Sequence, residues 1–489
     1  MGRGFLSAVG LSIVIFSTVS SAWASIDARV FEAMDLEFNG VPPAKGRVGK
    51  PLWTALELYQ RKEDVLAHFG APPEIDYDSR WQDLIQVRPF SQSSQGITDL
   101  LKYLDPEAQF GRFFEVGTLP SLLRAYRDRD SRSVSDYDVP FLPATLAQPP
   151  AFLEGIQKAA AQKGSAKPLQ GLRIALDPGH MGSKKWDQLS GKYIVDIKSG
   201  KRLSEGEIAL QTALLLEAEL TRLGAQVFVT RRGMHAVTPL PYDQLDVDEF
   251  AVRYLRENSL TSWFTDLIQT QNKGAPLYAS FKNSSNFKAL FTDYAKSVYY
   301  LLGADLQARA EIIEAFDPHI TLVLHYDVAT SSSADHGLSA GGRNGTKAYV
   351  VGSFEEEEFA SAEDRFFFVK HLMEPEAWNE SVKLSQAMVD TLQTQLAIPF
   401  DKSGGSAKQT ISPGVFSRNL VLCRNLTGHA LSYLEILFYN DPKEFAELTK
   451  SNYTMTIDGK AYPYSQRLVD VSNALRDGVL AYVGKHFLN

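Results

Sequence analysis

The chain has 489 residues, of which 44% are hydrophobic and 22% are charged, and this globular composition excludes a mostly disordered or collagen-like protein. Its 50 Lys and Arg against 58 Asp and Glu give a net charge of −8, which argues against nucleic acid as a partner because phosphate contacts need basic surfaces. The single cysteine, Cys423, excludes an intramolecular disulfide and any metal site built from several cysteines.

Residues 1–24 have the pattern of a secretory signal peptide. Arg3 supplies the positive charge, an apolar stretch follows, and Ala-Trp-Ala at 22–24 forms a cleavage site, with an uncleaved anchor as the alternative. No later apolar run approaches the roughly 20 residues that a membrane span needs. We therefore expect a mature chain without a membrane span, located in the periplasm or secreted.

The next part of the chain, residues 25–140, carries no motif associated with chemistry, and we expect a separate N-terminal domain of unknown role. The spacing of its apolar residues predicts helices over 52–69 and 119–126. Residues 141–170 are rich in proline, which indicates a linker, with a short helix expected over 152–162.

Strands alternate with helices from residue 171 to the C-terminus. Apolar runs predict strands over 172–176, 226–230, 320–324, 348–351 and 431–437, and helical spacing predicts helices over 207–223, 305–316, 381–396 and 467–483. This alternation is typical of an α/β fold, in which helices flank the sheet. In such sheets, ligands collect beyond the carboxyl ends of the strands.

Four residues able to bind metal or move protons lie on these elements, three of them at a strand or helix end. His180 follows the first strand in an Asp-Pro-Gly-His turn, Glu205 opens a helix, and His325 follows a buried strand. Two histidines and one carboxylate with an open fourth position form the ligand set of a catalytic zinc site. Glu435 lies within an apolar strand, where an unpaired carboxylate is costly, and metal-assisted hydrolysis needs such a group as a general base.

These segments, in this order, resemble the zinc-dependent N-acetylmuramoyl-L-alanine amidases of type 3, a family of cell-wall hydrolases. The resemblance rests on Asp-Pro-Gly-His at 177–180, on Glu205 with the later Thr230-Arg231, on the helix containing Arg309 before His325, and on the block at 434–440. It implies an amidase-type α/β fold with a mixed sheet over 171–489.

The resemblance also implies the chemistry of the site. His180, Glu205 and His325 are similar to the family's ligands for one Zn²⁺ per chain, and Glu435 is similar to its catalytic base. The substrate would be peptidoglycan, cut between N-acetylmuramic acid and L-alanine. Arg231 and His429 are candidate substrate-binding residues, with a structural ion pair and a polar loop histidine as the respective alternatives.

Some features keep other interpretations open. Met181, Asp327 and Leu437 depart from the family pattern, so a zinc peptidase or amidase acting on another extracytoplasmic substrate is one alternative. A catalytically impaired protein that binds or regulates the cell wall is another. Glu207 competes with Glu205 because helix N-termini attract carboxylates, although the spacing to the following helix favours Glu205. His319 is expected to be structural or to lie at the surface, because it is near the start of its strand.

Two segments, at about 235–304 and 353–378, exceed what the family core needs and are expected to be insertions. The second contains four consecutive glutamates at 355–358 and an aromatic run at 366–368. One interpretation is a solvated acidic turn joined to a helix. The other is a lid over the cleft that an activator protein would displace. The resemblance allows this, because some members of the family are held inactive in a similar way.

Overall fold

The structure is a computed structural model that describes residues 94–108, 114–118, 121–125, 137–140, 150–242, 299–329, 336–354, 362–404 and 409–486. The expected signal peptide and the expected helix over 52–69 lie outside the described residues, as do the glutamates at 355–358. Within the described ranges, no helix has both the length and the apolar character needed to cross a membrane.

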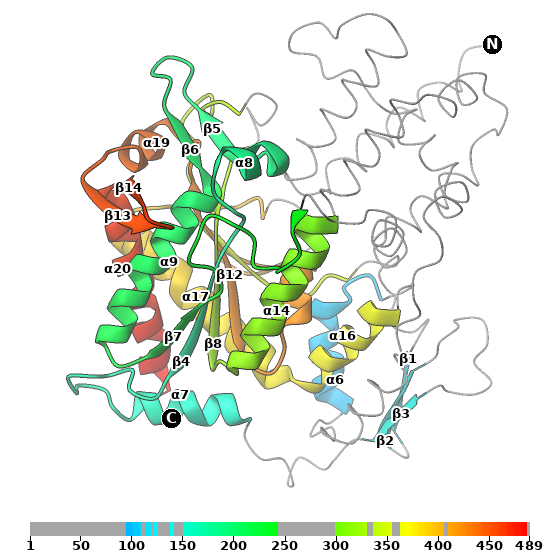
Figure 1. The fold of residues 1–489 in the computed structure, drawn as a ribbon. Coiled ribbons are helices and arrows are strands. Elements are labelled where there is room, and N and C mark those ends of the chain that lie inside the picture. Colours follow the sequence, from blue (N-terminus) through cyan, green and yellow to red (C-terminus); the bar gives the residue numbers. More distant parts are fainter. Residues whose placement is uncertain are drawn as a thin grey trace, which may run out of the picture.

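A seven-stranded mixed sheet forms the centre of the molecule (Figure 1), as the resemblance implies, with the strand order β10-β11-β9-β12-β8-β4-β7. Strands β12, β8, β4 and β7 pair in parallel, while β9 runs antiparallel to β12. The bounds are β4 Arg173–Pro178, β7 Gln226–Val229, β8 Ile320–Asp327, β9 Lys347–Val350, β10 Gln409–Ser412, β11 Val415–Ser417 and β12 Ala430–Phe438. The central strands are buried on both faces, which explains why they read as nearly continuous apolar runs.

Helices cover both faces of the sheet. On one face, α9 (Glu205–Arg222) contacts β4, β7 and β8, and α17 (Pro375–Leu396) contacts β12 and β9. The C-terminal α20 (Gln466–Lys485) packs on both of these helices. On the other face, α14 (Asp305–Phe316) contacts β4 (Figure 1). Because each helix presents an apolar side to the sheet, the core lies between these layers.

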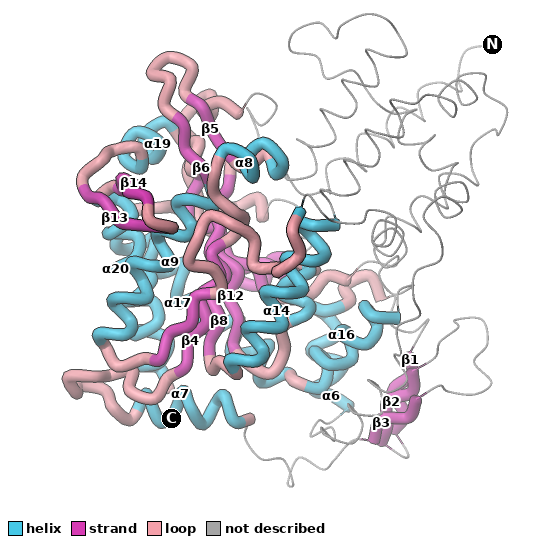
Figure 2. The backbone as a smooth tube through the Cα atoms, viewed as in Figure 1, coloured by secondary structure: helices cyan, strands magenta, loops and turns pink. Residues whose placement is uncertain are grey.

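Short elements gather at the end of the sheet where β4 and β8 finish (Figure 2). They include α8 (Lys184–Ser190) and the hairpin formed by β5 (Tyr193–Val195) and β6 (Arg202–Ser204), which leads directly into α9. The same end also holds η4 (Tyr299–Ala304), α19 (Pro442–Leu448) and the hairpin of β13 (Tyr453–Ile457) with β14 (Lys460–Tyr464), whereas α18 (Val421–Asn425) immediately precedes β12 at the opposite end. The carboxyl ends of the strands are thus surrounded by loops, where α/β proteins place their ligands.

The helix expected over 119–126 is wrong. Residues 121–125 form β2 (Ser121–Ala125), which pairs antiparallel with β1 (Phe114–Thr118) and β3 (Tyr137–Pro140). A short apolar run fits a helix or a strand equally well by its spacing, and here the pairing with neighbouring strands decides.

The sequence predicts a linker over 141–170, but from residue 150 onward the structure has a helix that is packed into the core. Helix α7 (Ala151–Ala160) confirms the expected short helix, but it is packed into the core through Phe152 and Ile156. Gly155 lets the His319 ring approach the helix, since a Cβ there would lie 2.3 Å from that ring. From Ala151 onward the chain is therefore a core helix, while residues 141–149 of the expected linker lie outside the described residues.

The described part of the segment at 353–378 also belongs to the core. Helix α16 (Ala362–Met373) contacts α17, α18 and α6 (Ser94–Leu104), and it buries Phe366, Phe367 and Phe368. Tyr103 of α6 stacks on Trp378 with ring centroids 4.7 Å apart. Both α6 and α16 are thus built into the same hydrophobic core as the seven-stranded sheet.

Candidate metal centre and active site

Three side chains that can bind metal converge at the carboxyl end of the sheet. They are His180, Glu205 and His325, whose ligand atoms all lie within 4.8 Å of one another. Oε1 of Glu205 is 3.0 Å from Nδ1 of His325 and 3.4 Å from Nε2 of His180. The two imidazole rings meet edge to face, with centroids 4.7 Å apart. The structure therefore brings together the three residues that the sequence singled out as ligands.

The turn after β4 places His180 at the cluster. The backbone of His180 has φ of +53°, in the left-handed region that non-glycine residues rarely adopt and that often marks functional sites. The preceding Gly179 has no side chain that could obstruct the other histidine, since a Cβ at this position would lie 2.3 Å from the His325 ring. The Asp-Pro-Gly-His motif thus positions His180 and also leaves space for the ring of His325.

A buried network holds this turn from behind. The carboxylate of Asp177 accepts hydrogen bonds from the hydroxyl of Thr230 and, at 2.9 Å, from Nη1 of Arg309. Arg309 also donates to the carbonyl oxygens of Pro178 at 2.7 Å and of His180 at 3.0 Å. Sequence reasoning matched Thr230 and Arg309 to family motifs without assigning them a role, and the structure shows that they anchor the ligand turn.

Arg231 performs a similar task for two ligand-bearing segments at once. It is 3% exposed, and its guanidinium donates to the carbonyl oxygens of Pro178, Gly179, Gly206 and Gly233. The first two oxygens belong to the segment before His180, and the third belongs to the first turn of α9. This geometry favours a structural role for Arg231 over the substrate contact expected from the sequence, and the bonds go to backbone oxygens instead of an ion-pair partner.

Glu205 is aimed by the start of α9. The hydroxyl of Ser204 caps the helix by accepting from the backbone N–H of Glu207, and it donates to Asp187 at 2.7 Å. Oε1 of Glu205 also accepts from the backbone N–H of Tyr326 at 3.3 Å. Glu207 is not part of the three-residue cluster. The geometry therefore supports Glu205 over its sequence neighbour.

Glu435 lies in the same row of the sheet as one of the histidines. It is the register partner of His325 in the parallel β12–β8 ladder and of Lys347 in the antiparallel β12–β9 ladder. Tyr433, two residues earlier on the same face, stacks on the His325 ring at 4.5 Å. Among the described residues, no hydrogen-bond partner reaches the buried Oε2 of Glu435. A buried carboxylate oxygen in this situation is typical of a site that receives water or a ligand.

Electrostatics sets the protonation of the site. Burial, followed by the charges of Asp327 and Glu205, raises the pKa of Glu435 well above its usual range. Burial, followed by the charge of Lys192, lowers the pKa of His180 well below its usual range. The His180 imidazole is therefore neutral at physiological pH, which is the form that binds a metal ion.

The donor set fits a zinc ion. Tetrahedral zinc with bonds of about 2.1 Å places neighbouring ligand atoms roughly 3.4 Å apart. Oε1 of Glu205 is 3.0 Å from the His325 nitrogen and 3.4 Å from the His180 nitrogen, and all three ligand atoms lie within 4.8 Å of one another. Two imidazoles and one carboxylate leave a fourth position for water or substrate. Oε2 of Glu435 has no hydrogen-bond partner among the described residues, and Glu435 is paired with His325 in the ladder. A water molecule in the fourth position could therefore bond to this oxygen.

The other histidines singled out from the sequence lie at the opposite end of the strands. His429 hydrogen-bonds to Thr321, which is four residues before His325 on β8, or about 13 Å along the strand. His319 accepts a hydrogen bond from the backbone N–H of Arg173, and burial lowers its pKa to about 4. His319 is structural, as expected, and the geometry does not support a substrate contact for His429.

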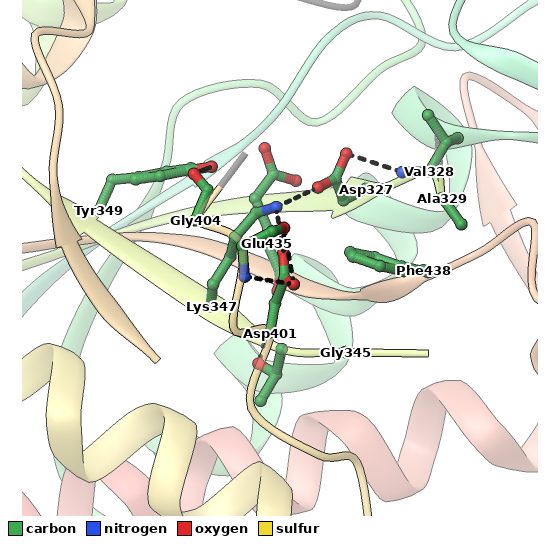
Figure 3. Close-up of polar contacts among 12 residues, drawn as sticks. Asp327, Val328, Ala329, Gly345, Lys347, Tyr349, Asp401, Gly404, Glu435 and Phe438 are labelled. Carbon is green, nitrogen blue, oxygen red and sulfur yellow. Dashed lines mark hydrogen bonds and ion pairs between the residues drawn. The ribbon is translucent and has the colours of Figure 1, made fainter. Parts of the chain in front are cut away.

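Two residues near Glu435, Lys347 and Asp401, were not identified from the sequence. Lys347 opens β9, and its ammonium pairs with Asp327 and with Asp401, as Figure 3 shows. The one signal in the sequence is a lysine that immediately precedes an apolar strand. No local pattern connects it with Glu435, which is 88 positions further along the chain.

The fold and the site together define an α/β protein with a candidate metal centre at the carboxyl edge of a mixed sheet. A family model described as N-acetylmuramoyl-L-alanine amidase matches residues 174–462, which is more than half of the chain. The chain therefore belongs to this family of hydrolases. No curated protein matches it.

Several solved structures are similar to this chain at low identity. An N-acetylmuramyl-L-alanine amidase from Mycobacterium smegmatis has 15% identity, covering 65% of this chain and 98% of its own, with a TM-score of 0.34. The CwlD amidase from Clostridioides difficile, solved in complex with the GerS lipoprotein, has 14% identity, 64% and 99% coverage, and a TM-score of 0.33. The catalytic domain of an amidase from Bacillus (Paenibacillus) polymyxa has 14% identity, 64% and 97% coverage, and a TM-score of 0.31.

Proposed function

We propose that this protein is a zinc-dependent hydrolase that cleaves the amide bond between N-acetylmuramic acid and L-alanine in peptidoglycan, outside the cytoplasm. The observation that carries the proposal is the convergence of His180, Glu205 and His325 within 4.8 Å, in a chain of the amidase family. The position of Glu435 in the same row as His325 supports its role as the general base. The signal-peptide pattern of residues 1–24 supports a periplasmic or secreted location.

In the proposed mechanism, His180, Glu205 and His325 would hold the zinc ion, which supplies Lewis-acid chemistry toward the scissile carbonyl and the attacking water. Burial favours the protonated form of Glu435, but a cation held in the cluster would favour the ionised form, and the ionised carboxylate then accepts the proton of that water through its unpartnered Oε2. The oxygen then bonds to the carbonyl carbon, the amide C–N bond breaks, and Glu435 returns the proton to the nitrogen of the leaving L-alanine. One carboxylate thus acts first as base and then as acid.

Two of the three departures from the family pattern are packing residues. Met181 is buried in a small cluster with Ala236, Tyr300 and Ala304, and Leu437 is completely buried in the main core. Neither observation favours another extracytoplasmic substrate. All four residues proposed for the chemistry are present, so the geometry does not favour an impaired binding or regulatory protein either.

A regulatory lid with an activator protein stays a prediction. The glutamates at 355–358, which are the acidic part of that lid, lie outside the described residues. Helix α16 contributes Phe366, Phe367 and Phe368 to the core. Deleting the whole segment would therefore unfold the protein, and a test of the lid should instead neutralise the four glutamates and measure turnover.

The proposed function is tested by zinc content and by muropeptide release from purified peptidoglycan, for the wild type and Glu435→Gln. We expect one zinc per chain in both proteins, and a fall in turnover of about 10²- to 10⁴-fold in the variant, the range typical of a lost general base. Glu207→Gln is the matched control and should retain both zinc and activity. A wild-type protein that binds no zinc would contradict the proposal, as would a Glu435→Gln variant with normal turnover.

A further inference from the structure

Lys347 extends across β12, the strand that carries Glu435. Strand β12 lies between β9, which carries Lys347, and β8, which carries Asp327. The Nζ atom of Lys347 is nevertheless 2.6 Å from Oδ2 of Asp327, and it is 2.8 Å from Oδ2 of Asp401 (Figure 3). The side chain must therefore pass over β12 to reach its partner on the far strand.

The register places this lysine beside the proposed base. Lys347 and Glu435 are directly opposite in the antiparallel ladder, so their side chains leave the sheet from the same face. His325 is opposite Glu435 on the other side. The sheet therefore presents a row of three side chains, with a lysine, the proposed base and a proposed zinc ligand on adjacent strands.

The charges around Lys347 explain why a cation is needed here. Asp327, Asp401 and Glu435 all interact electrostatically with Lys347, whose exposed fraction is 2%. Carboxylates that share a buried region repel one another, and each is costly without a counterion. Asp401 has a second cation, Arg343, at 2.9 Å. Asp327 pairs with the ammonium directly, and a neutral amide at position 327 would not form this ion pair.

We propose that Lys347, clamped by Asp327 and Asp401, is a positioning residue that holds the Glu435 carboxylate in the row beside His325. The two aspartates fix the ammonium over β12, and its positive charge keeps Glu435 from being displaced by the neighbouring carboxylates. The aspartate at 327 and the lysine at 347 thus form one unit. The catalytic part of this inference rests on the proposed function, because it assigns Glu435 the role of base.

The kinetic test compares Lys347→Met, which removes the charge, with Lys347→Arg, which keeps it. We expect kcat of the methionine variant to fall about 10- to 100-fold, with KM changed less than about twofold and zinc content unchanged, because a positioning residue acts on the base and not on substrate binding. The arginine variant should recover most of the loss. Lys383→Met, which removes an exposed lysine paired with Glu380, is the matched control and should have normal kcat.

A methionine variant with wild-type kcat would overturn the proposal, as would a loss confined to KM. Should Lys347→Met fail to fold, the double variant Lys347→Met with Asp327→Asn removes one carboxylate together with the ammonium. It should fold, keep its zinc and still have a kcat below that of the Asp327→Asn single variant. Equal kcat values for the double and single variants would overturn the proposal.

A second measurement does not depend on amidase activity. A double-mutant cycle combines Lys347→Met with Glu435→Gln and measures the unfolding equilibrium of the four proteins in urea. We expect a coupling of about 2- to 150-fold in the unfolding constant, the range found for residues that share a network. Additive effects would overturn the proposal. A wild type without zinc or activity would contradict the proposed function alone, and the cycle would still decide whether Lys347 holds Glu435.

Discussion

At the scale of single residues, the cluster of candidate metal ligands depends on groups that are not part of it. Arg231 and Arg309 both donate to backbone carbonyl oxygens of the turn at 177–180. Gly179 leaves room for the His325 ring. A cluster of three ligands from three separate elements forms only when such supports fix the backbone of each element.

Replacing Arg231 tests whether it supports the site or binds substrate. Arg231→Met leaves buried carbonyl oxygens without donors, and each such loss costs about 1–3 kcal/mol. We expect the free energy of unfolding to fall by at least about 2 kcal/mol, together with a loss of zinc affinity. Urea unfolding and zinc titration check this. A raised KM with normal stability and zinc affinity would instead support the substrate contact expected from the sequence.

Gly179→Ala tests the close approach of the turn to His325. A Cβ at this position would lie 2.3 Å from the imidazole ring, so the ring must move. We expect zinc affinity to fall at least about tenfold, as is typical when the support of a metal ligand is disturbed. Gly484→Ala is the matched control, because a Cβ there meets nothing within 4 Å. The two variants are compared by zinc competition with a chelator, and equal affinities would contradict the prediction.

At the scale of elements, α17 and α20 are joined by a buried carboxylate. Glu380 on α17 accepts a hydrogen bond from the Tyr482 hydroxyl at 2.8 Å and pairs with His486 at 2.8 Å. Burial acts to raise the pKa of Glu380, but hydrogen bonds from His486, Lys383 and Tyr482 outweigh it and lower the pKa to about 2. The contact between these helices therefore depends on pH.

The sign of this dependence follows from the lowered pKa. The ionised form of Glu380 stabilises the folded protein fully above the ordinary pKa of 4.5, and this stabilisation is lost as the pH falls from 4.5 to about 2. We expect Glu380→Gln to lower the free energy of unfolding at pH 7 by about 1–3 kcal/mol. The variant should also have a flatter stability profile between pH 4.5 and 2. Urea unfolding at several pH values checks this, and parallel profiles would contradict it.

At the scale of the whole molecule, the catalytic body is larger than the segment matched by the family. Helix α7 packs on α20, and α6 packs on α16 and α17, so segments before residue 171 complete the core. The backbone N–H groups of Ser353 and Phe354 bond to Tyr103 and Leu104 at the end of α6, each at 2.8 Å. The N-terminal boundary of the folded unit therefore does not coincide with the start of the family resemblance.

Substitutions in α7 test this boundary. Ile156 is completely buried, and we expect Ile156→Ala to lower the free energy of unfolding by about 2–5 kcal/mol, the range for large-to-small changes in a core. Lys158→Ala on the same helix is the exposed control and should change it by less than about 0.5 kcal/mol. Thermal unfolding of both variants checks this prediction. If α7 were part of a linker, both substitutions would have equally small effects on stability.

The sequence by itself determined the alternation of strands and helices and the residues that make up the cluster. The helix over 305–316 coincides with α14, and the strands expected over 226–230 and 431–437 match β7 and β12 within one residue at each end. These predictions succeed because buried parallel strands and amphipathic helices leave local apolar patterns. His180, Glu205 and His325 were identifiable because each lies near the end or the start of such an element, although His325 is inside β8, which extends three residues beyond the strand expected over 320–324.

Only the tertiary structure decided which distant side chains meet. Lys347, Asp327 and Asp401 come from separate segments, and their contact depends on the order and register of β9, β12 and β8. The roles of Arg231 and Arg309 likewise depend on backbone carbonyl oxygens, which every residue has and no sequence pattern distinguishes. The burial of α7 depends on α20, far along the chain, and the strand at 121–125 depends on its pairing with β1 and β3. Contacts of this kind are set by packing between elements, so a local pattern does not reveal them.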